Sequence, residues 1–179
     1  NLAGKQKKLI VRAIVIMKNL FLIRHAKSSW DTPNLDDADR PLNTRGNRDA
    51  PIMAQRMASN WPVPELIFCS RAKRARETAD ILKRFWWKEK EIKVEGELYD
   101  ASASDVLNFI TDAPDAVDSM AFVFHNPTIT FLSNILTYLE IPNVPTCGIV
   151  SLRAEVNEWK EIEPGKCELL DFDFPKREH

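Results

Sequence analysis

The sequence predicts an α/β fold with a largely parallel central sheet, on three observations. Short apolar runs typical of buried strands alternate along the chain with segments of helical periodicity, which favours parallel strands joined by helices. The chain has 179 residues, which is the length of one domain. Its composition, 44% apolar and 28% charged, is that of a globular protein rather than a disordered one.

Four segments have the composition of buried strands, each bounded by turn-forming or polar residues. They are residues 20–23, 65–69, 92–94 and 120–124. Two later segments, 148–154 and 158–162, flank a polar triplet and predict a hairpin. The carboxyl-terminal tail mixes Phe172 and Phe174 with proline and basic residues, and we expect it to be loosely attached.

Four further segments place apolar residues at the i, i+3, i+4, i+7 spacing of an amphipathic helix. They are residues 48–61 with Pro51 in the first turn, 73–87, a segment around 106–110 whose N-cap is Ser102 or Ser104, and 129–139. Asn126-Pro127 predicts the start of the last of these helices, with asparagine as the N-cap and proline as the first helical residue. Ser70 is a similar candidate cap for the helix at 73–87.

Residues 1–16 are expected to be an extension outside the core, so that residues 17–179 form the single domain. Residues 1–18 carry five basic residues and no acid, and Arg12 interrupts an apolar run that otherwise resembles a signal peptide. The alternative is that residues 9–16 add an edge strand or a short helix.

The charge balance narrows the possible partners. Twenty-five basic and 26 acidic residues give a net charge of −1, which excludes a generic basic nucleic-acid binder and a polybasic membrane protein. The three cysteines, Cys69, Cys147 and Cys167, are odd in number and widely spaced, as suits a reducing cytoplasm. None forms a CxxC pair, so no cysteine zinc site is expected.

Cationic or imidazole side chains follow three of the predicted core strands. Arg24 and His25 follow the first strand, Arg74 comes shortly after the second, and His125 follows the fourth. Ligands of open α/β sheets bind beyond the carboxyl ends of the strands, and arginine presents a planar fork of donors to phosphoryl oxygens. The pattern therefore predicts a phosphate pocket, reinforced by the positive N-terminal ends of two helices.

Each of these residues also has an ordinary interpretation when taken alone. Arg24-His25 is consistent with a surface loop, and His125 with a buried, hydrogen-bonded histidine. Arg71, Lys73 and Arg76 are expected on a solvated helix face. It is the coincidence of three equivalent strand ends that favours the pocket.

Several motifs, in order along residues 18–165, resemble those of the histidine phosphatase (phosphoglycerate mutase-like) superfamily. Leu22-Ile23-Arg24-His25-Ala26 resembles its RHG signature, residues 74–79 its RAxxTA segment, and His125-Asn126-Pro127 its GHNP-type segment. Residues 24–30 together with 39–46 are similar to the SixA-type phosphohistidine phosphatases. Ala26 and Phe124 replace the glycines usual in the first and third motifs. Asp31 stands where phosphoglycerate mutases commonly have an asparagine, and it is not expected to be a ligand.

The resemblance implies a three-layer α/β/α sandwich of the phosphoglycerate mutase type and assigns roles to residues. By it, His25 is the nucleophile, Arg24 and Arg74 bind the phosphoryl oxygens, and His125 completes the pocket. Asp100 is the first candidate for a general acid and Glu97 the second, although an imidazole leaving group departs easily and a dedicated acid is then unnecessary. No cofactor or metal is expected, because the arginines supply the charge that phosphoryl transfer needs.

The resulting hypothesis is a cytoplasmic phosphatase that forms a phosphohistidine on His25 and acts on protein phosphohistidine. The first alternative keeps this mechanism with a small phosphomonoester or sugar phosphate as substrate. The second is a non-catalytic phosphate-binding module, which the retention of His25 disfavours. Phosphate or sulfate is expected to bind the pocket. Asp31, Asp36, Asp37 and Asp39 form an acidic cluster, with which Arg40 and Arg45 are expected to pair at the pocket rim.

Overall fold

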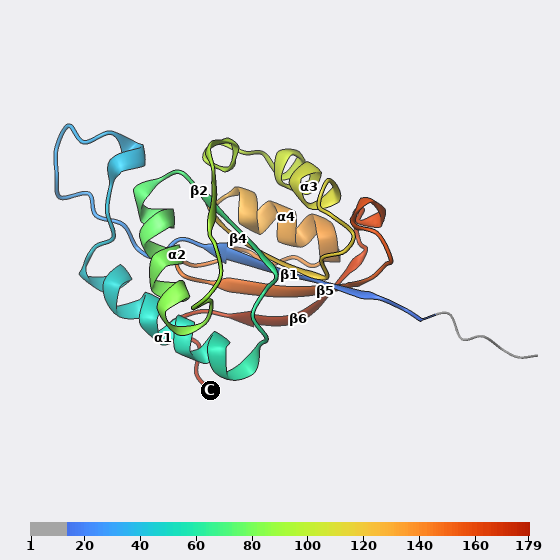
Figure 1. Ribbon diagram of the computed structural model, residues 1–179. Helices are drawn as coiled ribbons and strands as arrows, with labels where there is room; N and C mark the ends of the chain where they lie inside the picture. The colour runs from blue at the N-terminus through green and yellow to red at the C-terminus, as the bar shows by residue number, and fades with distance from the viewer. Residues whose placement is uncertain (1–13) are drawn as a thin grey trace, which may run out of the picture.

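A mixed six-stranded sheet forms the centre of the computed structural model, which describes residues 14–179 (Figure 1). The strands run in the spatial order β3-β2-β4-β1-β5-β6. Their bounds are β1 Met17–Arg24, β2 Leu66–Ser70, β3 Lys93–Glu95, β4 Ser119–Phe124, β5 Ile149–Glu155 and β6 Cys167–Asp173. The first four strands in this order are parallel, whereas β5 pairs antiparallel with β1 and β6 antiparallel with β5. The expected parallel sheet is therefore limited to four strands.

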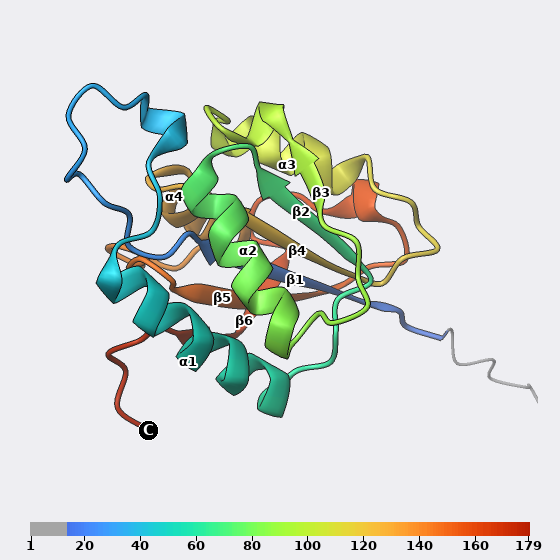
Figure 2. The ribbon, with the colours of Figure 1, turned by 60° about the vertical axis from the view of Figure 1, so that its left-hand side comes forward.

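Helices cover both faces of the sheet, as Figure 2 shows. Their bounds are α1 Thr44–Asn60, α2 Lys73–Phe85, α3 Ala103–Thr111 and α4 Thr128–Thr137. Because side chains alternate along a strand, Phe21 and Ile23 of β1 pack against α1 and α2, while Leu20 and Leu22 pack in a second core with α3 and α4. Two cores on opposite sides of one sheet hold β1 rigidly, and β1 delivers Arg24 and His25 to its carboxyl end.

Two predictions are wrong: that residues 158–162 form the second strand of a hairpin, and that the carboxyl-terminal tail is loosely attached. β5 pairs with β6, which contains Phe172, and residues 158–162 form a 3-10 turn at Trp159–Glu161. Trp159 is completely buried there, and its indole N–H donates to the carbonyl of Val117 at 2.7 Å. The apolar residues of this segment therefore anchor a turn instead of pairing in the sheet.

Two predicted helix starts are also corrected. α1 begins at Thr44, where the Asn43 side chain accepts a hydrogen bond from the Gly46 N–H, so Pro51 lies inside the helix rather than in its first turn. α4 begins at Thr128 with Pro127 at the N-cap position, after a cis Asn126-Pro127 bond. Asn126 therefore does not cap the helix backbone.

Of the two candidate caps for α3, Ser102 is the one used, and it forms a reciprocal capping box with Asp105. The prediction for residues 1–16 falls mostly outside the described residues and stays a prediction, as does the alternative for 9–16. β1 begins at Met17, and the preceding Ile14 and Val15 are exposed. No helix within residues 14–179 is long and apolar enough to cross a membrane.

Candidate active site

His25 lies at the carboxyl end of β1, where backbone hydrogen bonds fix it on both sides. Its N–H donates to the Phe124 carbonyl at 3.1 Å, and its own carbonyl accepts from the Cys147 N–H at 3.1 Å. The buried ring places Nδ1 2.7 Å from the carbonyl oxygen of Ala26. A carbonyl only accepts, so Nδ1 carries the proton and Nε2 holds a free lone pair.

Thr78 of α2 links this strand end to the helix that carries Arg74. Its buried hydroxyl accepts from the Ala26 N–H at 2.9 Å and donates to the Arg74 carbonyl at 2.7 Å. Ala26 in turn holds the His25 ring through its carbonyl. The threonine of the second motif thereby fixes the orientation of the first histidine.

His125 follows β4 and lies beside His25, with ring centroids 5.2 Å apart. Its Nε2 is 2.7 Å from the hydroxyl of Ser70, a completely buried residue at the end of β2. The Ser70 oxygen accepts from the Ala72 N–H at 3.3 Å, and its own proton can be donated to His125 Nε2. In that arrangement the proton of His125 is on Nδ1. Ser70 therefore orients a histidine and does not cap α2, whose N-cap is Ala72.

The two arginines bring unpaired donors to the same place. Arg24 uses Nη1 to donate to the Val144 carbonyl at 2.8 Å, and Arg74 uses Nη1 and Nη2 to donate to Asp37 at 2.7 and 3.0 Å. Within residues 14–179, four buried side-chain nitrogen or oxygen atoms lack a hydrogen-bond partner, and three of them are Arg24 Nε, Arg74 Nε and His125 Nδ1. An unpaired buried donor costs about 1–3 kcal/mol, and these three atoms belong to the principal predicted residues.

A cavity of about 240 Å³ brings all four of the principal predicted residues together. It is lined by Arg24, His25, Lys27, Ser28, Trp30, Arg40, Arg74, His125, Asn126 and Thr146. Arg40 was expected at the pocket rim, whereas Lys27, Ser28, Trp30 and Thr146 were not predicted to line a phosphate pocket. Most of them belong to the segment that projects from the body between β1 and α1 (Figure 2).

Burial and positive charge keep both histidines neutral. Burial, reinforced by the nearby His125, Arg74 and Arg24, lowers the pKa of His25 to about 3. Burial, followed by the positive charge of Arg74, lowers the pKa of His125 to about 4. Near pH 7 the Nε2 atom of His25 is therefore unprotonated and surrounded by cations.

The SixA-like segment at residues 39–46 supports the rim of this cavity. The Asn43 N–H donates to the Lys27 carbonyl at 2.9 Å, and Ser28 and Leu42 form an isolated antiparallel bridge. Gly46 lies so close that a Cβ atom there would be 2.3 Å from the Lys27 oxygen. Only glycine allows this approach of α1 to the segment between β1 and α1, residues 25–43, which we call the pocket segment.

Asp37 is a site residue that the sequence placed only within an acidic cluster. It accepts hydrogen bonds from Arg74 and from Tyr99, and it forms an ion pair with Arg40 at 3.0 Å. The Tyr99 hydrogen bond, followed by those of the two arginines, lowers the pKa of Asp37 to about 2. The expected pairing of Arg40 with this cluster is confirmed, but Arg45 donates instead to the Thr146 hydroxyl at 3.4 Å.

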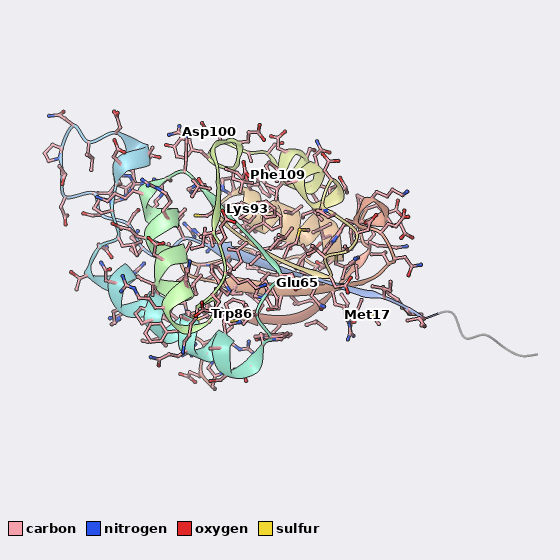
Figure 3. All side chains as sticks on the ribbon, in the orientation of Figure 1. Met17, Glu65, Trp86, Lys93, Asp100 and Phe109 are labelled. Atoms are coloured by element: carbon pink, nitrogen blue, oxygen red, sulfur yellow. The ribbon has the colours of Figure 1, made fainter. Side chains whose placement is uncertain are left out.

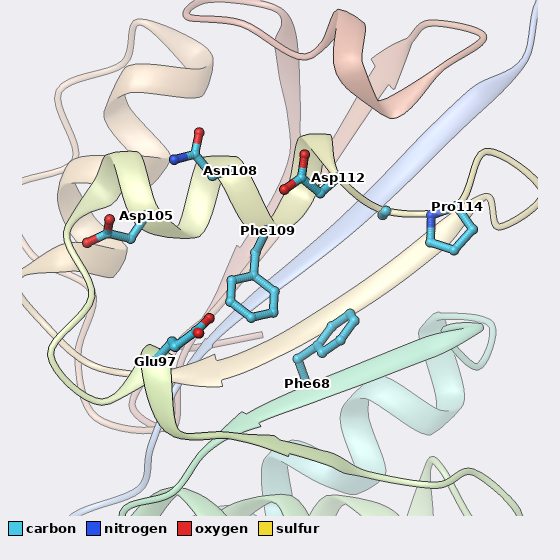
Figure 4. Close-up of a pocket in the computed structure, with 8 residues that line it drawn as sticks. Phe68, Glu97, Asp105, Asn108, Phe109, Asp112 and Pro114 are labelled. Carbon is cyan, nitrogen blue, oxygen red and sulfur yellow. The ribbon is translucent and has the colours of Figure 1, made fainter.

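The two acid candidates lie outside the cavity. Asp100 is exposed, in the turn between β3 and α3 where Figure 3 labels it. Glu97 lines a separate cavity of about 630 Å³ with Phe68, Phe109 and other residues, as Figure 4 shows. That larger cavity holds neither histidine nor arginine. Within residues 14–179, no three histidine, cysteine, aspartate or glutamate side chains gather as metal ligands.

Comparisons with known proteins agree with this geometry. Residues 20–106 match the Histidine phosphatase superfamily (branch 1), a range that includes Arg24, His25 and Arg74. The uncharacterized protein Rv1276c of Mycobacterium tuberculosis is 30% identical over 164 residues, covering 86% of this chain and 100% of that protein.

Solved structures of phosphatases also match this fold. A crystal structure from Agrobacterium tumefaciens, assigned as phosphohistidine phosphatase SixA, is 29% identical with a TM-score of 0.78, covering 88% of this chain and 98% of that one. The protein histidine phosphatase SixA complexed with tungstate has the same fold, with a TM-score of 0.73, 22% identity, and coverage of 88% and 97%.

The fold and the matches define a hydrolase that acts on phosphoryl groups. The chain belongs to the histidine phosphatase superfamily, and within it the chain is SixA-like.

Proposed function

We propose that this protein hydrolyses protein phosphohistidine, without a metal, through a phosphohistidine formed on its own His25. The observation that carries the proposal is the 240 Å³ cavity in which a neutral, oriented His25 meets His125 and two arginines. The buried free cysteines Cys69, Cys147 and Cys167 support a reducing, cytoplasmic setting.

In the first step, the lone pair of His25 Nε2 attacks phosphorus. The P–N bond of the substrate breaks, its electron pair stays on the departing imidazole nitrogen, and a proton from solvent neutralises that ring. The Nδ1 proton of His25 remains hydrogen-bonded to the Ala26 carbonyl, which stabilises the positive charge that the ring acquires. Arg24, Arg74 and the Nδ1–H of His125 stabilise the phosphoryl oxygens.

In the second step, a water molecule attacks phosphorus from the side the leaving group has vacated. The bond between phosphorus and His25 Nε2 breaks, and its electron pair returns to the ring as the lone pair. The proton of the water passes to solvent or to the phosphate produced. Inorganic phosphate leaves, and His25 is neutral again because its pKa is low.

Two features of the cavity favour a phosphoramidate on a protein over a small ester. None of the residues that line it carries a carboxyl group, so no acid is placed to protonate a poor alkoxide leaving group. The imidazole of phosphohistidine needs no such help. The cavity is also smaller than the ~300–1,000 Å³ typical of small-molecule sites, which favours a single modified side chain over a larger free substrate.

The test uses the full chain with a radiolabelled phosphohistidine protein and with p-nitrophenyl phosphate. The wild type should release phosphate from the phosphohistidine protein far faster than from the ester, and should itself carry an acid-labile, alkali-stable label after rapid quenching. His25→Ala should abolish both turnover and label. His179→Ala is the matched control and should behave like the wild type. His179 lies in the carboxyl-terminal tail, where its ring contacts Asp173 of β6, and it does not line the cavity.

Other outcomes reject specific parts of the proposal. Turnover that persists in His25→Ala rejects the covalent mechanism. Preference for p-nitrophenyl phosphate assigns the protein to small esters. Phosphate binding without turnover of either substrate makes it a phosphate-binding module.

A further inference from the structure

Trp30 is an exposed indole at the rim of the catalytic cavity. Its surface is 72% exposed, yet it lines the same cavity as His25 and Arg74. It lies in the segment between β1 and α1 that projects from the body of the molecule (Figure 2). A scattered exposed aromatic residue needs no explanation, but one beside a reactive site does.

Arg40 holds this indole in place. The guanidinium carbon of Arg40 lies 3.6 Å from the centroid of the Trp30 ring, in a cation–π contact. Arg40 itself is buried and fixed, because its nitrogens donate to Asp37 at 3.0 Å and to the Ser28 hydroxyl at 2.8 Å. Trp30 is thus supported by a side chain with little freedom, while most of its own surface stays open.

The cavity has room for more than a phosphoryl group. Its 240 Å³ corresponds to about eight water molecules at ~30 Å³ each. Once His25, Arg24, Arg74 and His125 surround the phosphoryl oxygens, the remaining space belongs to the leaving group. Trp30 and Arg40 line that cavity from the pocket segment.

We propose that Trp30 is a specificity residue that packs against the flat ring of the leaving group, so that the site selects a phosphoryl group bound to an aromatic nitrogen heterocycle. This inference rests on the proposed function, because the ring it selects is the imidazole of phosphohistidine. A rigid aromatic surface contributes about 0.5–1.5 kcal/mol per ring contact, which corresponds to a preference of roughly 2- to 13-fold.

The test compares two substrates that share a P–N bond and differ in the ring. Phosphoimidazole has the heterocycle, and phosphoramidate has only an amino group in its place. For Trp30→Ala, the ratio of kcat/KM for phosphoimidazole to kcat/KM for phosphoramidate should fall by about 2- to 13-fold from its wild-type value. Trp30→Phe should restore most of the ratio. Phe131→Ala, which removes another exposed aromatic residue outside the cavity, should leave the ratio unchanged.

The outcomes separate this inference from the function on which it rests. If Trp30 has only a structural role, Trp30→Ala lowers both kcat/KM values by the same factor and leaves their ratio at the wild-type value. That result overturns the inference alone. An unchanged ratio with unchanged rates overturns it as well. A wild type that hydrolyses the phosphohistidine protein but neither compound overturns the inference alone. A wild type that hydrolyses none of the three overturns the proposed function together with the inference.

Discussion

Replacing Ser70 with alanine perturbs the proposed site through one hydrogen bond. The Ser70 hydroxyl is 2.7 Å from His125 Nε2 and is completely buried, so alanine leaves that nitrogen without its donor. With that donor gone, nothing favours the Nδ1 tautomer, and the proton can move from Nδ1 to Nε2. His125 Nδ1 then becomes an acceptor beside the phosphoryl oxygens, and one hydrogen bond to a charged group is lost.

The magnitude follows from that loss. A hydrogen bond to a charged group contributes about 1.5–3 kcal/mol, so kcat/KM for a phosphohistidine substrate should fall by roughly 10- to 150-fold in Ser70→Ala. Nitrogen chemical shifts should show the proton of His125 on Nδ1 in the wild type and on Nε2 in the variant.

Ser133→Ala is the matched control for this experiment. Ser133 is also completely buried, but its hydroxyl donates at 2.7 Å to the Ile129 carbonyl within its own helix. It should leave both kcat/KM and the tautomer of His125 unchanged. A Ser70→Ala variant that keeps wild-type kcat/KM and the Nδ1 proton would refute the orienting role of Ser70.

Two further predictions concern the pocket segment and the nucleophile. Gly46→Ala places a Cβ 2.3 Å from the Lys27 oxygen and should lower kcat/KM, and it should also lower the free energy of unfolding in urea by about 1–3 kcal/mol. Gly96→Ala is the control, because a Cβ there meets nothing closer than 3.7 Å. Equal losses in the two variants would contradict the packing argument. His25 should show no NMR titration between pH 7.5 and 5, because its pKa is about 3 in the folded protein against 6.5 when unfolded. Its contribution to stability is therefore complete above pH 6.5 and is lost as the pH falls toward 3, by up to about 2 kcal/mol at pH 5, a loss that His25→Asn should not show. A His25 resonance that titrates near pH 6.5 would contradict this.

The principal site residues were predictable because local patterns fix them. Arg24, His25 and His125 follow short apolar runs directly, and a strand of a parallel sheet presents the residues after it at one edge. Arg74 lies within the first turn of a strongly amphipathic helix. Strand, strand end and helix period are all properties of a few consecutive residues.

Residues whose roles depend on distant partners were not predictable in this way. Asp37 contacts Arg74 and Tyr99 across 37 and 62 positions, and Ser70 contacts His125 across 55. No local pattern specifies these pairs, because they arise from the spatial order of the strands in the sheet.

Asp100 is the candidate acid that the structure leaves outside the cavity. It follows the third strand, as the resemblance suggests for an acid. A 3-10 turn at Gly96–Leu98 buries Leu98, however, and leaves Asp100 exposed.

The charges around the cavity resolve an apparent conflict between nucleophile and substrate. A phosphoryl dianion needs cations, but a histidine nucleophile must remain uncharged. Here burial lowers the pKa of His25 most, and the same arginines that attract the anion lower it further. Asp37 accepts from the two terminal nitrogens of Arg74, through its backbone carbonyl and its carboxylate, and the carboxylate stays ionised because its pKa is about 2. The carboxylate limits repulsion among the cations and holds Arg74 in place, while the buried Nε of that arginine has no hydrogen-bond partner.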